Sequence, residues 1–109
     1  MELKCTALTA IAYKHIFGRE LLRDMKEISE DNMNTDVLVR LCYVEALGAS
    51  GINAREIMGK TQDDFYDWLM EQPPLEANKE ILTQVTNTYF KNQATTSKAK
   101  NLNGRQSGK

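Results

Sequence analysis

The stretch Thr35–Leu47, which reads TDVLVRLCYVEAL, is the most apolar segment of the chain and decides its fold. Apolar side chains recur in it at helical spacing, which lines them up along one side of a helix: Val37, Leu38, Leu41, Cys42, Val44 and Leu47. Thr35 or Asp36 is suited to cap the beginning of this helix, and the run GASG at 48–51 ends it. We therefore expect a central helix against which the remaining segments pack.

Two further helices are predicted on the N-terminal side, over Thr6–Phe17 and over Arg19–Ser29. Gly18 lies between them and can adopt the left-handed conformation that ends a helix, although a single kinked helix through Gly18 is the alternative. The predicted buried face of the first helix consists of Ala7, Leu8, Ile11, Ala12, His15 and Ile16. That of the second consists of Leu21, Leu22, Met25 and Ile28.

On the C-terminal side, Thr61 and Asp64 have the spacing of a capping box and open another helix. Pro73 should end that helix, because a proline keeps the preceding residue out of the helical region. Pro74 suits the first turn of a last helix that runs to about Lys91. Its predicted buried face consists of Leu75, Ile81, Leu82, Val85 and Tyr89.

These segments predict an all-α, single-domain bundle of about five helices over residues 1–91. Residues 52–59 form either a loop or a short helix begun by Asn53. No stretch shows the sustained period-two alternation of a strand. The chain has 109 residues and a mass of 12.4 kDa, which fits one domain with a modest core. Its stability should be marginal, which leaves room for support from self-association or from a partner.

The end of the chain, residues 92–109, is polar and has Leu102 as its single large apolar residue. Such a segment buries too little surface to offset its ordering entropy, so we expect a disordered tail. Residues 1–90 carry nine basic and fifteen acidic residues, a net charge of −6, whereas residues 91–109 carry five basic residues and no acid. A basic arm for nucleic acid is the alternative, disfavoured because the tail has no aromatic ring to stack on bases.

Several classes of protein are disfavoured by what the sequence lacks. No apolar run is long enough to cross a membrane, and the N-terminus does not resemble a signal peptide, which predicts a cytosolic protein. Cys5 and Cys42 are expected to be buried thiols rather than a disulfide framework. A metal site built from these cysteines and His15 would have no ligand-spacing motif behind it, so we expect no metal.

Enzymatic chemistry is not indicated either. There is no phosphate-binding glycine loop and no nucleophile paired with a base. The acidic residues Asp63, Asp64, Asp67 and Glu71 are interpreted as the solvated face of a helix. His15 has no set of catalytic partner residues near it and is interpreted as a packed or half-exposed side chain. We therefore predict a protein that is not an enzyme and uses no cofactor.

Aromatic residues remain as candidates for binding another protein. Tyr13 and Phe17 lie four positions apart and share a helix face that differs from the predicted buried one. Phe65, Trp68 and Leu69, together with neighbouring apolar residues, cover more than one stripe of their helix. Each set is either core or a docking surface, and aromatic rings supply large contact areas at low entropic cost.

Two motifs carry a resemblance to a known family. The run YKHIFGREL at 13–21 resembles the opening of the phage tail assembly chaperones of phages with long non-contractile tails. That family shows Tyr with a basic residue, two variable positions, Phe-Gly, then a basic, an acidic and an aliphatic residue. Glu20 stands where Asp is common in the family. The run FYDWL at 65–69 is similar to a second family segment, and the polar, lysine-bearing ending is also similar.

The resemblance implies a non-enzymatic function in the host cell cytoplasm. Such chaperones coat the tape measure protein, keep it soluble until the tail tube assembles around it, and are absent from the mature virion. Many are also made in a longer form by ribosomal frameshifting, and the added domain recruits tail tube protein. Carried onto this chain, the partner-binding residues are Tyr13, Phe17, Arg19, Phe65, Trp68 and Leu69.

Two other functions stay open at the level of sequence. A small helical regulator that binds nucleic acid would need a helix-turn-helix, yet residues 48–60 are longer than its tight turn. The candidate recognition helix, Thr61–Gln72, carries four acids and no Lys or Arg, which repels phosphate. A structural component that completes the tail or head would differ from a chaperone by being present in finished virions.

Overall fold

The structure is a computed structural model, and it describes residues 1–28 and 34–91. Within these ranges every regular element is helical and no strand occurs. The elements are α1 (Ala7–Phe17), α2 (Leu21–Lys26), α3 (Thr35–Ala49), α4 (Ala54–Met58), α5 (Gln62–Met70), the 3-10 turn η1 (Leu75–Ala77) and a helix over residues 79–91. The predicted all-α fold is confirmed. The predicted disordered tail, residues 92–109, lies outside the described residues.

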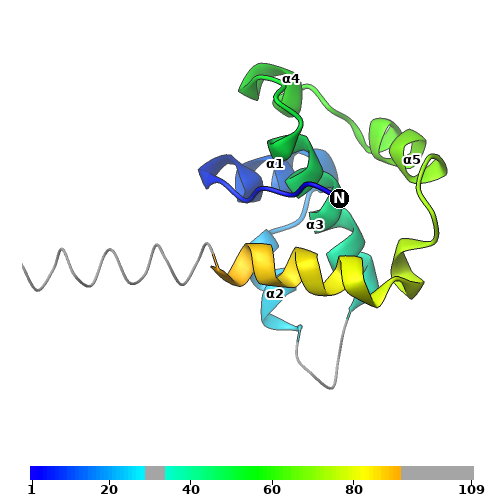
Figure 1. Cartoon of the computed structure of the whole chain (residues 1–109). Coiled ribbons are helices and arrows are strands. Elements are labelled where there is room, and N and C mark those ends of the chain that lie inside the picture. The colour runs from blue at the N-terminus through cyan, green and yellow to red at the C-terminus, as the bar shows by residue number, and fades with distance from the viewer. Residues whose placement is uncertain (29–33, 92–109) are drawn as a thin grey trace, which may run out of the picture.

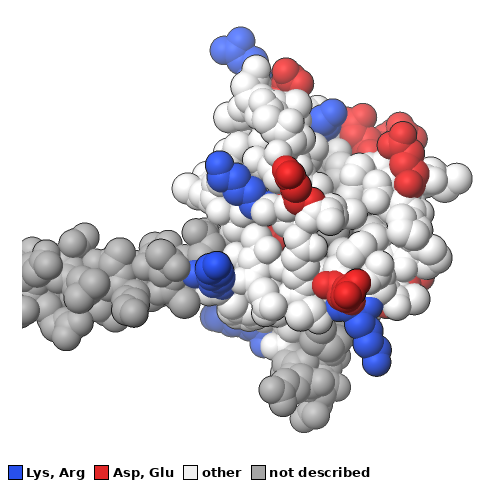
Figure 2. Space-filling model, in the orientation of Figure 1, with Lys and Arg blue, Asp and Glu red and all other residues white. Residues whose placement is uncertain are grey.

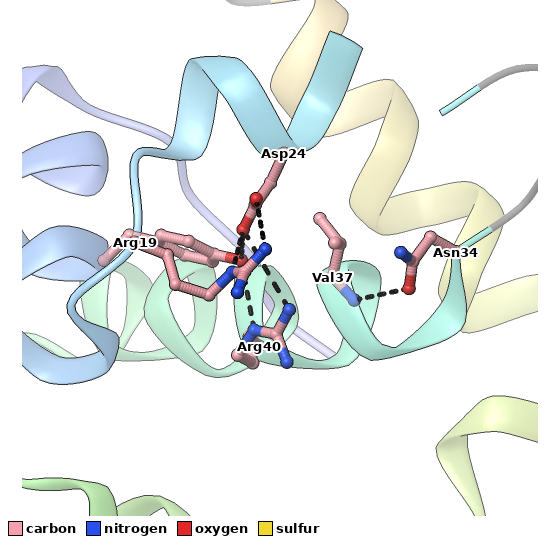
Figure 3. Close-up of polar contacts among 6 residues, drawn as sticks. Arg19, Asp24, Asn34, Val37 and Arg40 are labelled. Carbon is pink, nitrogen blue, oxygen red and sulfur yellow. Dashed lines mark hydrogen bonds and ion pairs between the residues drawn. The ribbon is translucent and has the colours of Figure 1, made fainter. Parts of the chain in front are cut away.

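Helix α3 lies in the middle of the molecule, as its apolar sequence predicts (Figure 1). Its buried residues are Val37, Leu38, Leu41, Cys42, Tyr43, Val44, Glu45 and Leu47. The capping residue is Asn34 rather than Thr35 or Asp36, because its Oδ1 accepts a 3.4 Å hydrogen bond from the Val37 N–H (Figure 3). The predicted position of α3 is therefore correct, with its cap one residue earlier and its end at Ala49.

Helix α1 begins where predicted but presents a different face to the core. Thr6 caps it by accepting a hydrogen bond from the Leu8 N–H, at 3.1 Å. The predicted buried face is wrong in part, because Ile11 is 56% exposed and His15 is also exposed. Thr9 and Tyr13 are buried instead. Their hydroxyl groups have hydrogen-bond partners in the fold, which removes the cost of burying them.

Gly18 separates α1 from α2. It has a φ of 68°, the left-handed conformation that glycine adopts without steric penalty, and its N–H donates to the Lys14 carbonyl at 2.7 Å. The alternative of one continuous helix is therefore wrong. Helix α2 is shorter than predicted, since it begins at Leu21 and ends at Lys26.

Residues 52–59, left open between loop and helix, contain the short helix α4. Asn53 caps it through a 2.8 Å hydrogen bond from the Glu56 N–H to its Oδ1.

The predicted capping box of α5 is confirmed, since Thr61 and Asp64 each accept the other's backbone N–H. Helix α5 has Phe65 as its buried residue, and Trp68 and Leu69 pack against the core while partly buried.

The prediction of one last helix from Pro74 is wrong. Residues Leu75–Ala77 form the turn η1, and Asn78 then leaves the helical region with φ −99° and ψ 91°. The Asn78 side chain caps the 79–91 helix by accepting from the Ile81 N–H at 3.1 Å. This break directs Leu75 into the core, where it is 4% exposed.

In residues 1–28 and 34–91, no helix combines the length and apolarity needed to span a bilayer.

Candidate protein-binding site

Five aromatic rings from three helices form a continuous aromatic cluster: Tyr13, Phe17, Tyr43, Phe65 and Trp68. The rings of Tyr13 and Phe17 meet edge to face at 5.2 Å, and Phe17 meets Phe65 in the same way at 4.9 Å. Tyr43 of α3 lies 5.3 Å from Phe65 and 5.2 Å from Trp68. Edge-to-face and tilted rings at such distances attract one another beyond their buried area. The cluster therefore joins α1, α3 and α5.

Beside this cluster, Asp24 of α2 accepts hydrogen bonds from Tyr13 of α1 and from Arg19, which lies in the corner between α1 and α2 (Figure 3). Arg19 binds its carboxylate through two nitrogens, at 2.8 and 2.9 Å, and the Tyr13 hydroxyl donates to it at 2.7 Å. Arg40 of α3 donates to the Tyr13 oxygen at 3.1 Å and has its guanidinium carbon 6.0 Å from the centre of the Phe17 ring. We call these four residues, Tyr13, Arg19, Asp24 and Arg40, the Asp24 cluster.

The Asp24 carboxylate is buried yet ionised. Its side chain is 4% exposed, and the hydrogen bonds from Arg19 lower its pKa below the usual value. Burial raises the pKa of the Tyr13 hydroxyl to about 12, so this group remains a donor at neutral pH. The Asp24 cluster therefore fixes α1, α2 and α3 relative to one another with paired groups rather than with apolar contact alone.

An open pocket of about 370 Å³ lies between α3 and the α5–η1 segment. It is lined mainly by apolar side chains, with a few polar ones between them: Asp36, Val39, Arg40, Phe65, Leu69, Gln72, Pro73, Pro74, Leu75 and Glu76. We call it the α3–α5 pocket. One wall is Phe65 of the aromatic cluster, and another is Arg40 of the Asp24 cluster. Such a volume can receive one or two large apolar side chains from a partner.

Helix α5, which contributes Phe65 and Leu69 to this pocket, combines exposed apolar side chains with negative charge. On α5, Met70 is 86% exposed and Tyr66 is 51% exposed. Residues 61–77 carry five acids and no Lys or Arg, and acidic side chains gather over α5 in Figure 2. The site therefore combines a mainly apolar pocket with acidic side chains on the segment that forms part of it.

The structure brings the six predicted partner-binding residues into one region. Phe65 and Leu69 line the α3–α5 pocket, and Phe17 and Trp68 are partly buried against Phe65. Arg19 is half-exposed but is bound to Asp24. Tyr13 is 0% exposed, so in this structure it supports the site from within the core rather than forming its surface.

Sequence reasoning missed several residues of the site. Arg40 and Tyr43 lie on the apolar helix α3, and nothing in their local sequence shows that they face α1 and α5. Asp24 was not predicted as a site residue either. The five-residue step from Arg19 to Asp24 crosses the α1–α2 corner, and this is the one local signal that could have indicated their pairing.

The α3–α5 pocket is lined by apolar side chains with charged and amide groups between them. In the described parts of the chain, no group of three or more His, Cys, Asp or Glu side chains is placed to hold a metal ion.

Comparison of the chain with protein-family models, with curated proteins and with solved structures gives no match. The functional proposal therefore depends on the sequence motifs and on the geometry of the α3–α5 pocket.

Proposed function

We propose that this protein is a non-enzymatic chaperone of phage tail assembly that binds the tape measure protein and keeps it soluble in the host cytoplasm. The observation that carries the proposal is the α3–α5 pocket, which is open and lined mainly by apolar side chains; α5, which contributes Phe65 and Leu69 to it, also exposes Tyr66 and Met70. A long helical client exposes apolar residues at helical spacing, and insertion of one such residue into a pocket is a common mode of helix recognition.

Two further features support this proposal. Both sequence motifs that resemble the chaperone family contribute side chains to one contiguous region, the aromatic cluster and the pocket beside it. The net charge of residues 1–90 is −6, which favours solubility of a client coated with many copies. A longer, frameshifted form that recruits tail tube protein, and absence from the finished virion, belong to the same proposal.

The proposal predicts that pocket-side variants lose the client. Replacing Leu69 and Met70 together by serine removes one pocket-lining and one exposed apolar side chain, and should lower affinity for tape measure protein about tenfold or more. The measurement is co-purification with the co-expressed client, and circular dichroism should show an unchanged helix content. Tyr13 is unsuitable for this test, because its buried ring would report stability instead.

Ile11 and Leu22 provide the matched control. They are 56% and 60% exposed, lie on α1 and α2, and do not line the α3–α5 pocket. Serine at both positions should leave co-purification unchanged. Equal losses in the two double variants would contradict a specific site on the α3–α5 side. Tight DNA binding that weakens steeply with salt would instead favour the nucleic-acid regulator.

A further inference from the structure

Residues 1–5 form an extended segment that lies across α3 and reaches the 79–91 helix (Figure 1). The Lys4 N–H donates to the backbone oxygen of Glu45 at 3.0 Å, and Gln84 donates to the Met1 carbonyl at 2.6 Å. The Met1 sulfur lies 3.6 Å from the sulfur of Cys42, which is 0% exposed. The segment therefore covers part of the buried side of α3.

Gly48 makes this close approach possible. A Cβ atom added at Gly48 would lie 2.7 Å from the backbone oxygen of Lys4, well inside van der Waals contact. The obstructing atom is backbone, so relief would require the N-terminal segment to move. The segment can thus lie this close to α3 because position 48 is a glycine.

Next to this segment, α3 carries a buried carboxyl group without a hydrogen-bond partner: the Glu45 carbonyl accepts the Lys4 N–H, and the Glu45 carboxyl lies close enough to Cys42 to help raise the pKa of that thiol. The Glu45 side chain is 0% exposed, and among the described residues neither of its oxygens has a hydrogen-bond partner. Burial raises its pKa to about 8, and no neighbouring charge contributes to this shift. The ionisable groups on the N-terminal segment are the Met1 amine, Glu2, Lys4 and Cys5. On α3, Cys42 is affected both by the Glu45 carboxyl, which raises the pKa of the thiol, and by the Met1 amine, which lowers it.

We propose that residues 1–5 act as a latch over α3 that stays closed while the Glu45 carboxyl is protonated and opens when it ionises. An ionised carboxylate in this position has no donor and must reach water. Helix α3 cannot supply the movement, because the aromatic cluster and the core hold it. The N-terminal segment has no helical structure, so displacing it breaks no helix and it is the least costly cover to displace.

Cys42 is the reporter for the latch, because its side chain is 0% exposed and the Met1 sulfur of the segment lies against it. The experiment measures the rate at which an uncharged disulfide reagent modifies Cys42 between pH 5 and 9, with peptide mass separating Cys42 from Cys5. In both proteins the modification rate of Cys42 rises with pH because more of the thiol becomes thiolate. Dividing the wild-type rate by the Glu45→Gln rate at each pH cancels this common contribution. We expect this ratio to increase roughly tenfold per pH unit and to level off above about pH 8.

Gly48→Ala tests the latch without changing Glu45. It should raise the modification rate of Cys42 already at pH 6, whereas Gly59→Ala, which adds the same methyl group with ordinary contacts, should not. If Glu45→Gln fails to fold, Glu45→Met gives the same comparison. A wild-type to Glu45→Gln ratio independent of pH, or no effect of Gly48→Ala, would overturn the proposal. So would a parallel loss of native Trp68 fluorescence, because the whole domain would then be unfolding.

Discussion

Asp24→Asn should lower the free energy of unfolding by about 3 kcal/mol at neutral pH. The substitution removes the charge that Arg19 binds and weakens the acceptor of the buried Tyr13 hydroxyl. Breaking a buried ion pair costs about 3–5 kcal/mol, and the lower value applies because the Arg19 side chain is half-exposed and regains water. Urea unfolding followed by circular dichroism measures the difference.

The same difference should depend on pH with a defined sign. Because the pKa of Asp24 is lower in the folded state than in the unfolded chain, its contribution is present above the unfolded pKa of about 4. It is lost as the pH falls through the folded-state pKa. The difference in free energy of unfolding between wild type and Asp24→Asn should therefore have its full value at pH 7 and should decrease below about pH 4.

Asp67→Asn is the matched control, because Asp67 is exposed on α5. An exposed substitution of this kind changes stability by less than about 0.5 kcal/mol. If the two variants unfold at the same urea concentration, the Asp24 cluster does not hold the α1–α2 corner against α3.

Phe65→Ala should have a comparable or larger effect, lowering the free energy of unfolding by about 3–5 kcal/mol. Phe65 is the buried residue of α5, and its ring contacts those of Phe17, Tyr43 and Trp68. Its removal leaves a cavity at the joint between α1, α3 and α5 and deprives the α3–α5 pocket of a wall. A small domain has a total stability of only about 5–15 kcal/mol, so much of the reserve is lost.

Phe90→Ala provides a comparison with identical chemistry. Phe90 is 46% exposed at the end of the 79–91 helix, where its ring meets Tyr89 at 5.1 Å. We expect a loss below about 1 kcal/mol, measured by the same urea titration. Circular dichroism is the better probe for both variants, because the Trp68 ring lies beside Phe65 and its fluorescence would change for local reasons. Similar losses in both variants would show that the aromatic cluster adds no special stability.

The candidate site was predictable in part. Apolar spacing identified Phe65 and Leu69, and the motif around Phe17 identified the α1–α2 corner, although the sequence did not place these residues side by side. The residues left Tyr13 open between core and docking surface, and the resemblance made it a partner-binding residue; its side chain is buried. The reason is its hydroxyl group, which can enter the core because Asp24 accepts its hydrogen bond.

Local chemistry set the helices of this protein. Periodicity located α3, Thr61 with Asp64 located the start of α5, and Gly18 located the corner after α1, because caps and left-handed glycines act within a few residues. Tertiary structure alone decided which face of α1 is buried, that Arg40 reaches Tyr13 across twenty-seven positions, and that the Glu45 carboxyl is buried without a hydrogen-bond partner. These outcomes depend on partners distant in the sequence, and no local pattern encodes the distance between two side chains on different helices.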